Sequence, residues 1–220
     1  MTERPLSDDE RRLMAAIGRG PDGRSTDIAS GGGAPRWLDV MLSFCSRCGA
    51  ELVRAVLPDE SRERLACPDC GQIAYVNPRM VVTTLPLDAD GNLILIRRGI
   101  EPGYGSWAQP GGFLEVDETV SEAAVRETLE ETGYLVRPGE LIGLYSRLEA
   151  AVVTLAFEAA VVGGEAKPCA ESLEIVPFRP ADIPWAEIAF TTSYWAIRDW
   201  VMRRHPEVEV PRAFHGRDRL

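Results

Sequence analysis

Residues 112–134 read GFLEVDETVSEAAVRETLEETGY, and this stretch constrains the fold more than any other part of the chain. Thr119 and Glu122 have the spacing of a capping box, which marks the start of a helix. Gly133 is a residue typical of the position just after a helix ends. The sequence therefore predicts a helix over 120–132.

The predicted helix carries a cluster of acidic side chains. At about 100° per residue, Glu127, Glu130 and Glu131 project from one face of the helix. Arg126 precedes Glu130 by one turn and can form an ion pair with it. Three like charges on one face repel each other by a few tenths of a kcal/mol per pair, so we expect a positive charge between them.

Two interpretations of this acidic face are open. A solvated glutamate face on an amphipathic helix is the commoner origin of such a charge run. Carboxylates without a nearby histidine or cysteine are also the ligands that Mg²⁺ and Mn²⁺ prefer. The match of the whole spaced stretch to a known motif favours the metal site.

That spacing resembles the Nudix box, G-x5-E-x7-R-E-U-x-E-E-x-G-U, where U is apolar. Eight of the nine defined positions match, and Thr128 stands where the family has an apolar residue. The resemblance implies an α/β fold, the Nudix α/β/α sandwich, and a hydrolase. It also implies that Arg126 orients the carboxylates and that a glycine carbonyl, of Gly111 or Gly112, completes a metal shell. By the same resemblance the Mg²⁺ or Mn²⁺ ligands are Glu127, Glu130 and Glu131, with Glu118 as an outer contributor.

Four of the five cysteines form two C-x2-C pairs, separated by eighteen residues. They are Cys45, Cys48, Cys67 and Cys70. Each pair is followed by a glycine, as the turn of a zinc knuckle requires, so the pattern predicts a structural Cys₄ zinc site in a zinc ribbon. Two disulfides or a redox pair are the alternatives, and a reducing compartment disfavours the disulfides.

The chain divides into four segments by composition. Residues 1–42 hold a predicted helix from Ser7 to Ile17 and a glycine-rich flexible tether. Residues 43–77 form the zinc ribbon, 78–204 the Nudix hydrolase domain and 205–220 a C-terminal tail. The apolar run at 37–42 is expected to pack against the ribbon or a partner chain, which leaves a homodimer open.

Within 78–204 the pattern predicts several strands and a closing helix. A hairpin joins 80–87 to 92–98, and further strands are expected at 141–148, 151–162 and 173–178. The closing helix is expected over 193–204, with Tyr194, Ile197, Trp200 and Val201 on its buried side.

The formal net charge is −10, so the protein has no general field that would attract a polyanion. A small-molecule nucleotide substrate is therefore expected, and long nucleic acid is not. The N-terminus lacks the apolar core of a signal peptide, and no apolar run is long enough to span a membrane. We expect a cytoplasmic protein that does not enter membranes.

Hydrolysis of a diphosphate also needs a general base that accepts a proton from the attacking water. The two histidines, His205 and His215, are poor candidates because they lie beyond the closing helix. A carboxylate is the better candidate, either within the box or on a later loop. Glu171 is the predicted external donor, with Glu174 beside it. Tyr104 and Trp107 precede the box and could stack on a substrate ring, although core packing of Trp107 is equally open.

A zinc ribbon before a Nudix domain resembles the NADH pyrophosphatase branch and a related branch that includes plant FAD pyrophosphatases. The first branch has an S-Q-P-W-P-F-P-x-S element after the box, and here residues 141–149 read LIGLYSRLE instead. Residues 70–82, 105–107, 171–174 and 183–190 resemble the second branch. FAD or ADP-ribose is therefore the favoured substrate, and NADH is the alternative.

Two other classes of function remain open. A non-catalytic Nudix-fold nucleotide sensor would be expected to have a damaged box, whereas this box keeps all its glutamates. A zinc-ribbon adaptor for nucleic acid or protein would be expected to carry a basic patch. Arginines and acidic residues nearly balance in 43–77: Arg47, Arg54, Arg62 and Arg64 against Glu51, Asp59, Glu60, Glu63 and Asp69.

Overall fold

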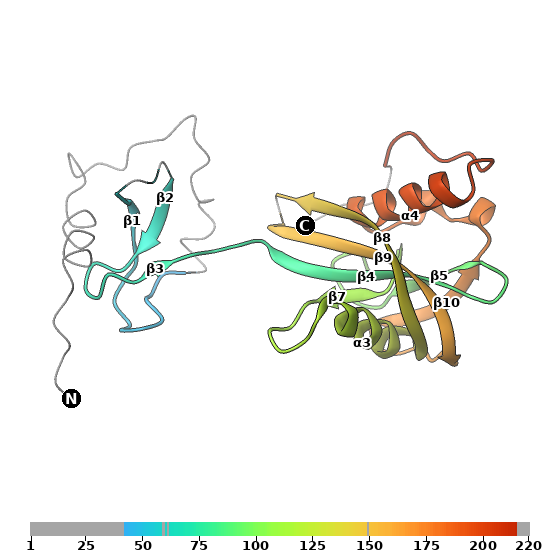
Figure 1. Cartoon of the computed structure of the whole chain (residues 1–220), viewed down its shortest axis with the longest axis horizontal. Coiled ribbons are helices and arrows are strands. Elements are labelled where there is room, and N and C mark those ends of the chain that lie inside the picture. The colour runs from blue at the N-terminus through green and yellow to red at the C-terminus, as the bar shows by residue number, and fades with distance from the viewer. Residues whose placement is uncertain (1–41, 59, 61, 149, 215–220) are drawn as a thin grey trace. The chain divides into compact units, whose positions relative to one another are not determined.

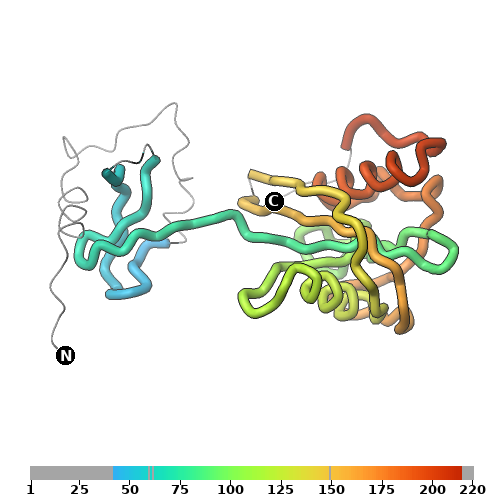
Figure 2. The backbone as a smooth tube through the Cα atoms, viewed as in Figure 1, coloured from blue at the N-terminus to red at the C-terminus, as the bar shows by residue number. Residues whose placement is uncertain are grey.

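The computed structural model describes residues 42–214 except 59, 61 and 149. The chain separates into two compact units at the junction between Asn77 and Pro78. The tube in Figure 2 follows the described backbone of each unit. The predicted helix from Ser7 to Ile17, most of the apolar run at 37–42 and His215 lie outside the described residues.

The first unit is a small antiparallel sheet with strand order β1-β2-β3. The strands are β1 (Val53–Val56), β2 (Glu63–Ala66) and β3 (Ile73–Ala74). Its core is small: Ala55, Leu57, Leu65 and Ala66 are buried, together with two of the cysteines. Because so little apolar surface is buried, a sheet of this size needs a further source of stability such as a metal.

The second unit contains a mixed sheet with strand order β10-β5-β4-β9-β8. Its strands are β4 (Arg79–Leu87), β5 (Leu93–Arg98), β8 (Tyr134–Arg147), β9 (Val152–Gly164) and β10 (Ser172–Phe178). Two short strands, β6 (Trp107–Ala108) and β7 (Gly111–Phe113), pair with β5 and β4. The pairing of β4 with β9 is parallel, and the other pairings in this sheet are antiparallel.

Two helices cover opposite faces of this sheet, as Figure 1 shows. Helix α3 (Val120–Thr132) packs Ala123 and Ala124 against Val82 of β4. Helix α4 (Thr191–Arg204) packs on the other face, against a core that includes Leu85 and Ala156. Short 3-10 turns at Pro180–Asp182 and Trp185–Glu187 lead into α4. This arrangement confirms the predicted α/β/α sandwich.

Local signals predicted the helix boundaries well. The side chain of Thr119 accepts a hydrogen bond from the Glu122 backbone and Glu122 returns one, so the capping box is formed. Gly133 ends α3 in the left-handed conformation at φ 75°. The predicted buried residues of the closing helix, Tyr194, Ile197, Trp200 and Val201, are all buried.

The start of β8 was predicted wrongly. The strand begins at Tyr134, directly after α3, whereas the sequence pattern placed its start at residue 141. Pro138 and Gly139 interrupt the pattern and resemble a turn, but the chain passes them with a shift in register between Pro138 and Leu141. Because β8 is at the edge of the sheet, a proline there need not break a ladder hydrogen bond.

Candidate active site

Helix α3 is held in a fixed rotation against the sheet by a buried pair of hydroxyl groups. Thr128 and Thr84 of β4 are both fully buried, and their Oγ1 atoms lie 2.6 Å apart. The Thr128 hydroxyl donates to the carbonyl of Ala124 at 2.7 Å, so the Thr84 hydroxyl must donate to Thr128. Thr128 stands where the Nudix box has an apolar residue. It nevertheless faces the core, and its hydroxyl group is fully hydrogen-bonded.

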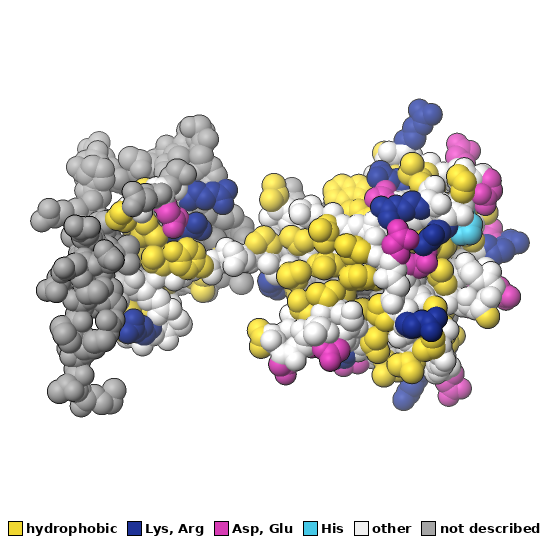
Figure 3. All heavy atoms as spheres, in the orientation of Figure 1, with side chains coloured by type: hydrophobic (Ala, Val, Ile, Leu, Met, Phe, Trp, Pro, Cys, Tyr) yellow, Lys and Arg dark blue, Asp and Glu magenta, His cyan; other side chains and the backbone are white. Residues whose placement is uncertain are grey.

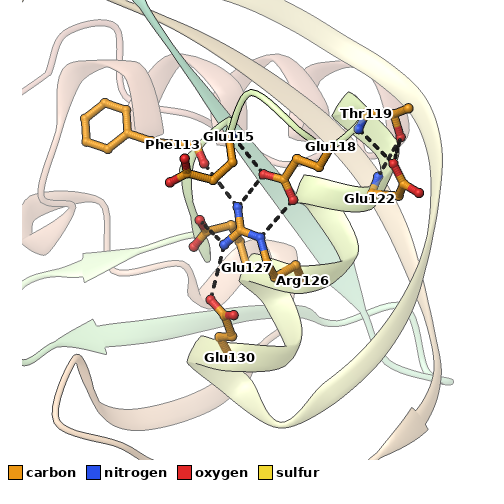
Figure 4. Close-up of polar contacts among 8 residues, drawn as sticks. All are labelled: Phe113, Glu115, Glu118, Thr119, Glu122, Arg126, Glu127 and Glu130. Carbon is orange, nitrogen blue, oxygen red and sulfur yellow. Dashed lines mark hydrogen bonds and ion pairs between the residues drawn. The ribbon is translucent and has the colours of Figure 1, made fainter.

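The guanidinium group of Arg126 lies among three of the glutamates, as Figure 4 shows. Its Nε and Nη2 atoms donate to the two oxygens of Glu118 at 2.8 and 2.6 Å, which is a bidentate pair. Its Nη1 atom donates to Glu127 at 2.7 Å and to Glu130 at 3.2 Å. The predicted pair with Glu130 is therefore present, and Arg126 also fixes the other two carboxylates. Arg126 thus supplies part of the positive charge expected between the glutamates.

Two glycines allow β7 to lie close to the elements on either side of it. The backbone N–H of Gly111 donates to Glu131 at 2.8 Å. A Cβ atom on Gly111 would lie 2.3 Å from the carbonyl oxygen of Val82, and its φ of 150° favours glycine. A Cβ atom on Gly112 would lie 2.5 Å from the carboxylate of Glu127. Gly112 is therefore needed for the close contact of β7 with Glu127 of α3, and Gly111 for the close contact of β7 with β4.

Burial and neighbouring charges give these carboxyl groups different pKa values. Burial raises the pKa of Glu131 to about 7, and the charges of Glu127 and Glu171 add to this effect. Burial also raises the pKa of Glu127, against the opposing effect of Arg126. The hydrogen bonds from Arg126 lower the pKa of Glu118 to about 2. A divalent cation would favour the charged forms of Glu131 and Glu127, the two groups whose pKa is raised, as expected of a metal site.

The donor set fits a hard divalent cation. Glu127, Glu130 and Glu131 all belong to α3 and offer carboxylate oxygens, with no histidine or cysteine among them. Glu131 is 8% exposed and Glu130 has a side chain 60% exposed, so the group runs from the protein interior to solvent. Gly111 is held against Glu131, which places it at this cluster. Such a set suits Mg²⁺ or Mn²⁺, which keep several water ligands.

The two later glutamates have different surroundings. The charge of Glu171 contributes to the raised pKa of Glu131, and its backbone carbonyl accepts a hydrogen bond from Gly99 at 2.8 Å. Glu174 instead forms an ion pair with Arg97 at 2.6 Å. Glu174 is thus engaged by an arginine, whereas the charge of Glu171 acts on Glu131.

The two aromatic candidates differ sharply in exposure. Trp107 is 8% exposed and packs in the core, with its ring 5.0 Å from that of Phe178 in an edge-on contact. Its burial favours core packing over substrate stacking. Tyr104 is 59% exposed and lies between two glycines with positive φ, Gly103 and Gly105. Its ring is available to a ligand.

His205 lies at the end of α4, with its ring 5.1 Å from that of Trp200. Sequence reasoning did not identify Arg98, which is partly buried near the carboxylates. Burial lowers the pKa of Arg98, and the charges of Glu131, Glu171 and Glu101 oppose this effect. Arg98 directly follows another arginine on β5, and nothing in the local pattern distinguishes the two.

The four cysteines of the first unit converge, with all four sulfur atoms within 4.8 Å of one another. The Sγ atoms of Cys45 and Cys70 are 3.6 Å apart, and those of Cys48 and Cys67 are 3.4 Å apart. Tetrahedral zinc with Zn–S bonds of about 2.3 Å needs sulfur atoms separated by about 3.8 Å, so the arrangement fits zinc.

The loops that carry these cysteines are built alike. Gly49 and Gly71 have φ values of 78° and 71° and donate backbone hydrogen bonds to the carbonyls of Cys45 and Cys67. Four thiolates would close the coordination shell of a zinc ion, so such an ion would be structural. The geometry contains no disulfide, since all the cysteines are free.

Comparison with known proteins identifies the family. Residues 77–201 match the NUDIX domain, and residues 43–76 match the Nudix N-terminal zinc ribbon. The chain belongs to the Nudix family. It is a Nudix hydrolase with an N-terminal zinc ribbon.

Curated relatives and solved structures agree with this assignment. The chain is 36% identical over 114 residues to the ADP-ribose pyrophosphatase of Methanocaldococcus jannaschii, covering 50% of this chain and 67% of that protein. It is 32% identical over 131 residues to the NAD-capped RNA hydrolase NudC of Pseudomonas aeruginosa, covering 60% of this chain and 45% of that protein. The chain thus spans between about half and two thirds of the length of these relatives.

A crystal structure of a NUDIX hydrolase from Nitrosomonas europaea superimposes with a TM-score of 0.71 at 34% identity. The match covers 77% of this chain and 96% of that one. Among the described residues, no helix is long and apolar enough to cross a membrane.

Proposed function

We propose that this protein is a Mg²⁺- or Mn²⁺-dependent pyrophosphohydrolase that cleaves a nucleoside diphosphate linked to another moiety, with ADP-ribose or FAD as its substrate. The observation that carries the proposal is the set of α3 carboxylates held in place by Arg126 and by the backbone of Gly111. The arrangement has the donors that a diphosphate hydrolase needs.

The residues have distinct roles in this proposal. Glu127, Glu130 and Glu131 would hold the divalent cations, with Glu118 at the outer side. These cations supply charge neutralisation on the diphosphate and a more acidic water. Arg126 keeps the carboxylates in place through the hydrogen bonds described above.

Glu171 is the proposed general base. It accepts a proton from the attacking water as the water oxygen bonds to a phosphorus atom of the diphosphate. The bond from that phosphorus to the bridging oxygen breaks, and the bridging oxygen leaves with the other phosphate. The products are AMP and ribose 5-phosphate from ADP-ribose, or AMP and FMN from FAD.

Several observations support these substrates. A relative at 36% identity is named ADP-ribose pyrophosphatase, and the segments flanking the box resemble the FAD pyrophosphatase branch. Tyr104, 59% exposed in the loop between β5 and β6, offers a ring on which a base or flavin can stack. On the face of the second unit seen in Figure 3, arginine and acidic side chains are interspersed, which disfavours long nucleic acid there.

NADH or an NAD cap is the second candidate. It is favoured by the relatives named NAD-capped RNA hydrolase NudC, at 32% identity over 131 residues. The absence of the S-Q-P-W-P-F-P-x-S element counts against it. We expect kcat/KM for ADP-ribose or FAD to exceed that for NADH by at least about tenfold, which corresponds to about 1.4 kcal/mol.

The test is incubation with Mg²⁺ or Mn²⁺ and a panel of ADP-ribose, FAD, NADH and an NAD-capped RNA, with products identified by mass. Glu130→Gln should lower kcat by several orders of magnitude, about 4 kcal/mol or more, because it removes a charge from the metal site without a change in size. Asp90→Asn, in the exposed turn between β4 and β5, is the matched control and should retain wild-type kcat.

A near-normal kcat for Glu130→Gln at saturating Mg²⁺ would exclude the box as the catalytic centre. A preference for NADH or the capped RNA would place the protein in the other branch. Tight binding of a panel member without turnover would instead identify a nucleotide sensor.

A further inference from the structure

Arg98, at the end of β5, is held rigidly from two sides. Its Nε atom donates to the carbonyl of Pro102 at 2.9 Å. Its guanidinium carbon lies 4.9 Å from the centroid of the Phe190 ring, in a cation–π contact. Phe190 is fixed in turn, because the neighbouring Ala189 donates its backbone N–H to the carbonyl of Trp107 at 2.8 Å.

The loop between β5 and β6 closes tightly over this arginine. A Cβ atom on Gly103 would lie 3.5 Å from the Nε atom of Arg98 and from the Phe190 ring, and 3.2 Å from Ala189. Gly103 also has a φ of 84°, which favours glycine. The guanidinium group therefore has little freedom to move, and fixing a ligand on it costs little further side-chain entropy.

The two Nη groups of Arg98 have no acceptor among the described residues, since Nε makes its one hydrogen bond there. Glu131, Glu171 and Glu101 act on Arg98 through their charges, yet none of them forms an ion pair with it in the described part of the chain. The neighbouring Arg97 is different: its Nε donates to Gly105 at 3.0 Å and its Nη1 to Glu174 at 2.6 Å.

A partly buried guanidinium with free Nη groups is a ready partner for an anion. The protein carries a net charge of −10, so an anionic substrate must be attracted by local cations. Arg126 cannot serve in this way, because its nitrogens are used by Glu118, Glu127, Glu130 and the carbonyl of Phe113.

We propose that the Nη groups of Arg98 bind a phosphate oxygen of the substrate's diphosphate. The inference rests on the proposed function, since it takes the scissile diphosphate as the ligand. Arg98 would then bind the diphosphate directly, and cations held by Glu127, Glu130 and Glu131 would supply further positive charge. It is a binding residue that the box motif does not include.

The test compares ADP with adenosine, because their difference in affinity isolates the diphosphate. Both affinities are measured by calorimetry in Ca²⁺, a hard cation that carboxylates bind. Arg98→Met keeps an apolar stem over Phe190 and removes the charge. We expect it to weaken ADP binding by about 10- to 100-fold, the loss typical of a charged hydrogen bond, and to leave adenosine binding within about twofold.

Arg97→Met is the matched control. It removes an adjacent arginine whose Nε and Nη1 atoms are already bonded to Gly105 and Glu174, so the ratio of ADP to adenosine affinity should stay within about twofold of the wild type. If Arg98→Met does not fold, Arg98→Lys keeps a charge near Phe190 but loses the planar fork. For Arg98→Lys we expect the ratio of ADP to adenosine affinity to fall by about fivefold or more.

Several results would overturn the inference: wild-type protein that binds ADP no more tightly than adenosine, an Arg98 variant with an unchanged ratio, or equal losses in the Arg97 and Arg98 variants. The proposed function is tested separately by turnover. Loss of ADP binding in Arg98→Met without any wild-type turnover would uphold this site and reject the hydrolase. Turnover by the wild type, together with an unchanged ratio of ADP to adenosine affinity in Arg98→Met, would uphold the hydrolase and reject this site.

Discussion

Replacement of Gly112 by alanine should damage catalysis while leaving the fold intact. The added Cβ atom would lie 2.5 Å from the Glu127 carboxylate, whereas ordinary contacts begin at 3.4 Å. The carboxylate must therefore move by about 0.9 Å, the difference between these two distances. Because it is the end of a flexible side chain, it can move without unfolding the protein.

A displacement of about 1 Å in a positioned catalytic group can cost about a hundredfold in rate, or about 2.7 kcal/mol. We expect kcat for ADP-ribose to fall by about that factor and Mn²⁺ affinity to fall with it. The free energy of unfolding should change by about 1 kcal/mol or less, because alanine also restricts the unfolded chain. Steady-state kinetics, Mn²⁺ titration and thermal unfolding measure the three quantities.

Gly163→Ala is the control, since a Cβ atom there meets nothing within 4 Å and its φ lies outside the left-handed region. It should leave both kcat and Mn²⁺ affinity unchanged. A Gly112→Ala protein with kcat within about threefold of the wild type would show that Glu127 need not stay where the structure places it. The same rate loss in both variants would also refute the reasoning.

Three further predictions concern stability. Thr128→Val should destabilise the protein by about 1–3 kcal/mol in chemical denaturation, because it leaves the buried Thr84 hydroxyl without a partner, and the double variant with Thr84→Val should recover most of this loss. Cys45→Ser should lower the zinc content found by elemental analysis and the melting temperature of the first unit; unchanged values of both would reject the zinc site. In chelator, stability should fall as pH rises from about 4.5 to about 7, because the unfolded state loses the Glu131 proton first, and Glu131→Gln should reduce this slope.

Much of the fold followed from local patterns. The capping box at Thr119 and the glycine at 133 set both ends of α3, since caps act over a few residues. The C-x2-C pairs brought their sulfur atoms together because each pair shares one tight turn. The hairpin from β4 to β5 and the buried face of α4 likewise follow from short-range periodicity.

Other features depended on contacts between distant segments. The sequence predicted Glu171 as the external donor with Glu174 beside it, and only the pairing of β10 with β5 brought Glu174 to Arg97. Trp107 became a core residue because Phe178, far along the chain, packs against its ring.

By itself, then, the sequence determined the glutamate helix, the cysteine pairs and the class of fold, because helix periodicity, caps and metal-ligand spacing are properties of neighbouring residues. Tertiary structure alone decided how the charges are distributed. It surrounded Arg126 with Glu118, Glu127 and Glu130, and it left Arg98 partly buried with free Nη groups while Arg97 was paired. Two adjacent arginines on a strand point to opposite faces, and what each face meets is set by the rest of the sheet.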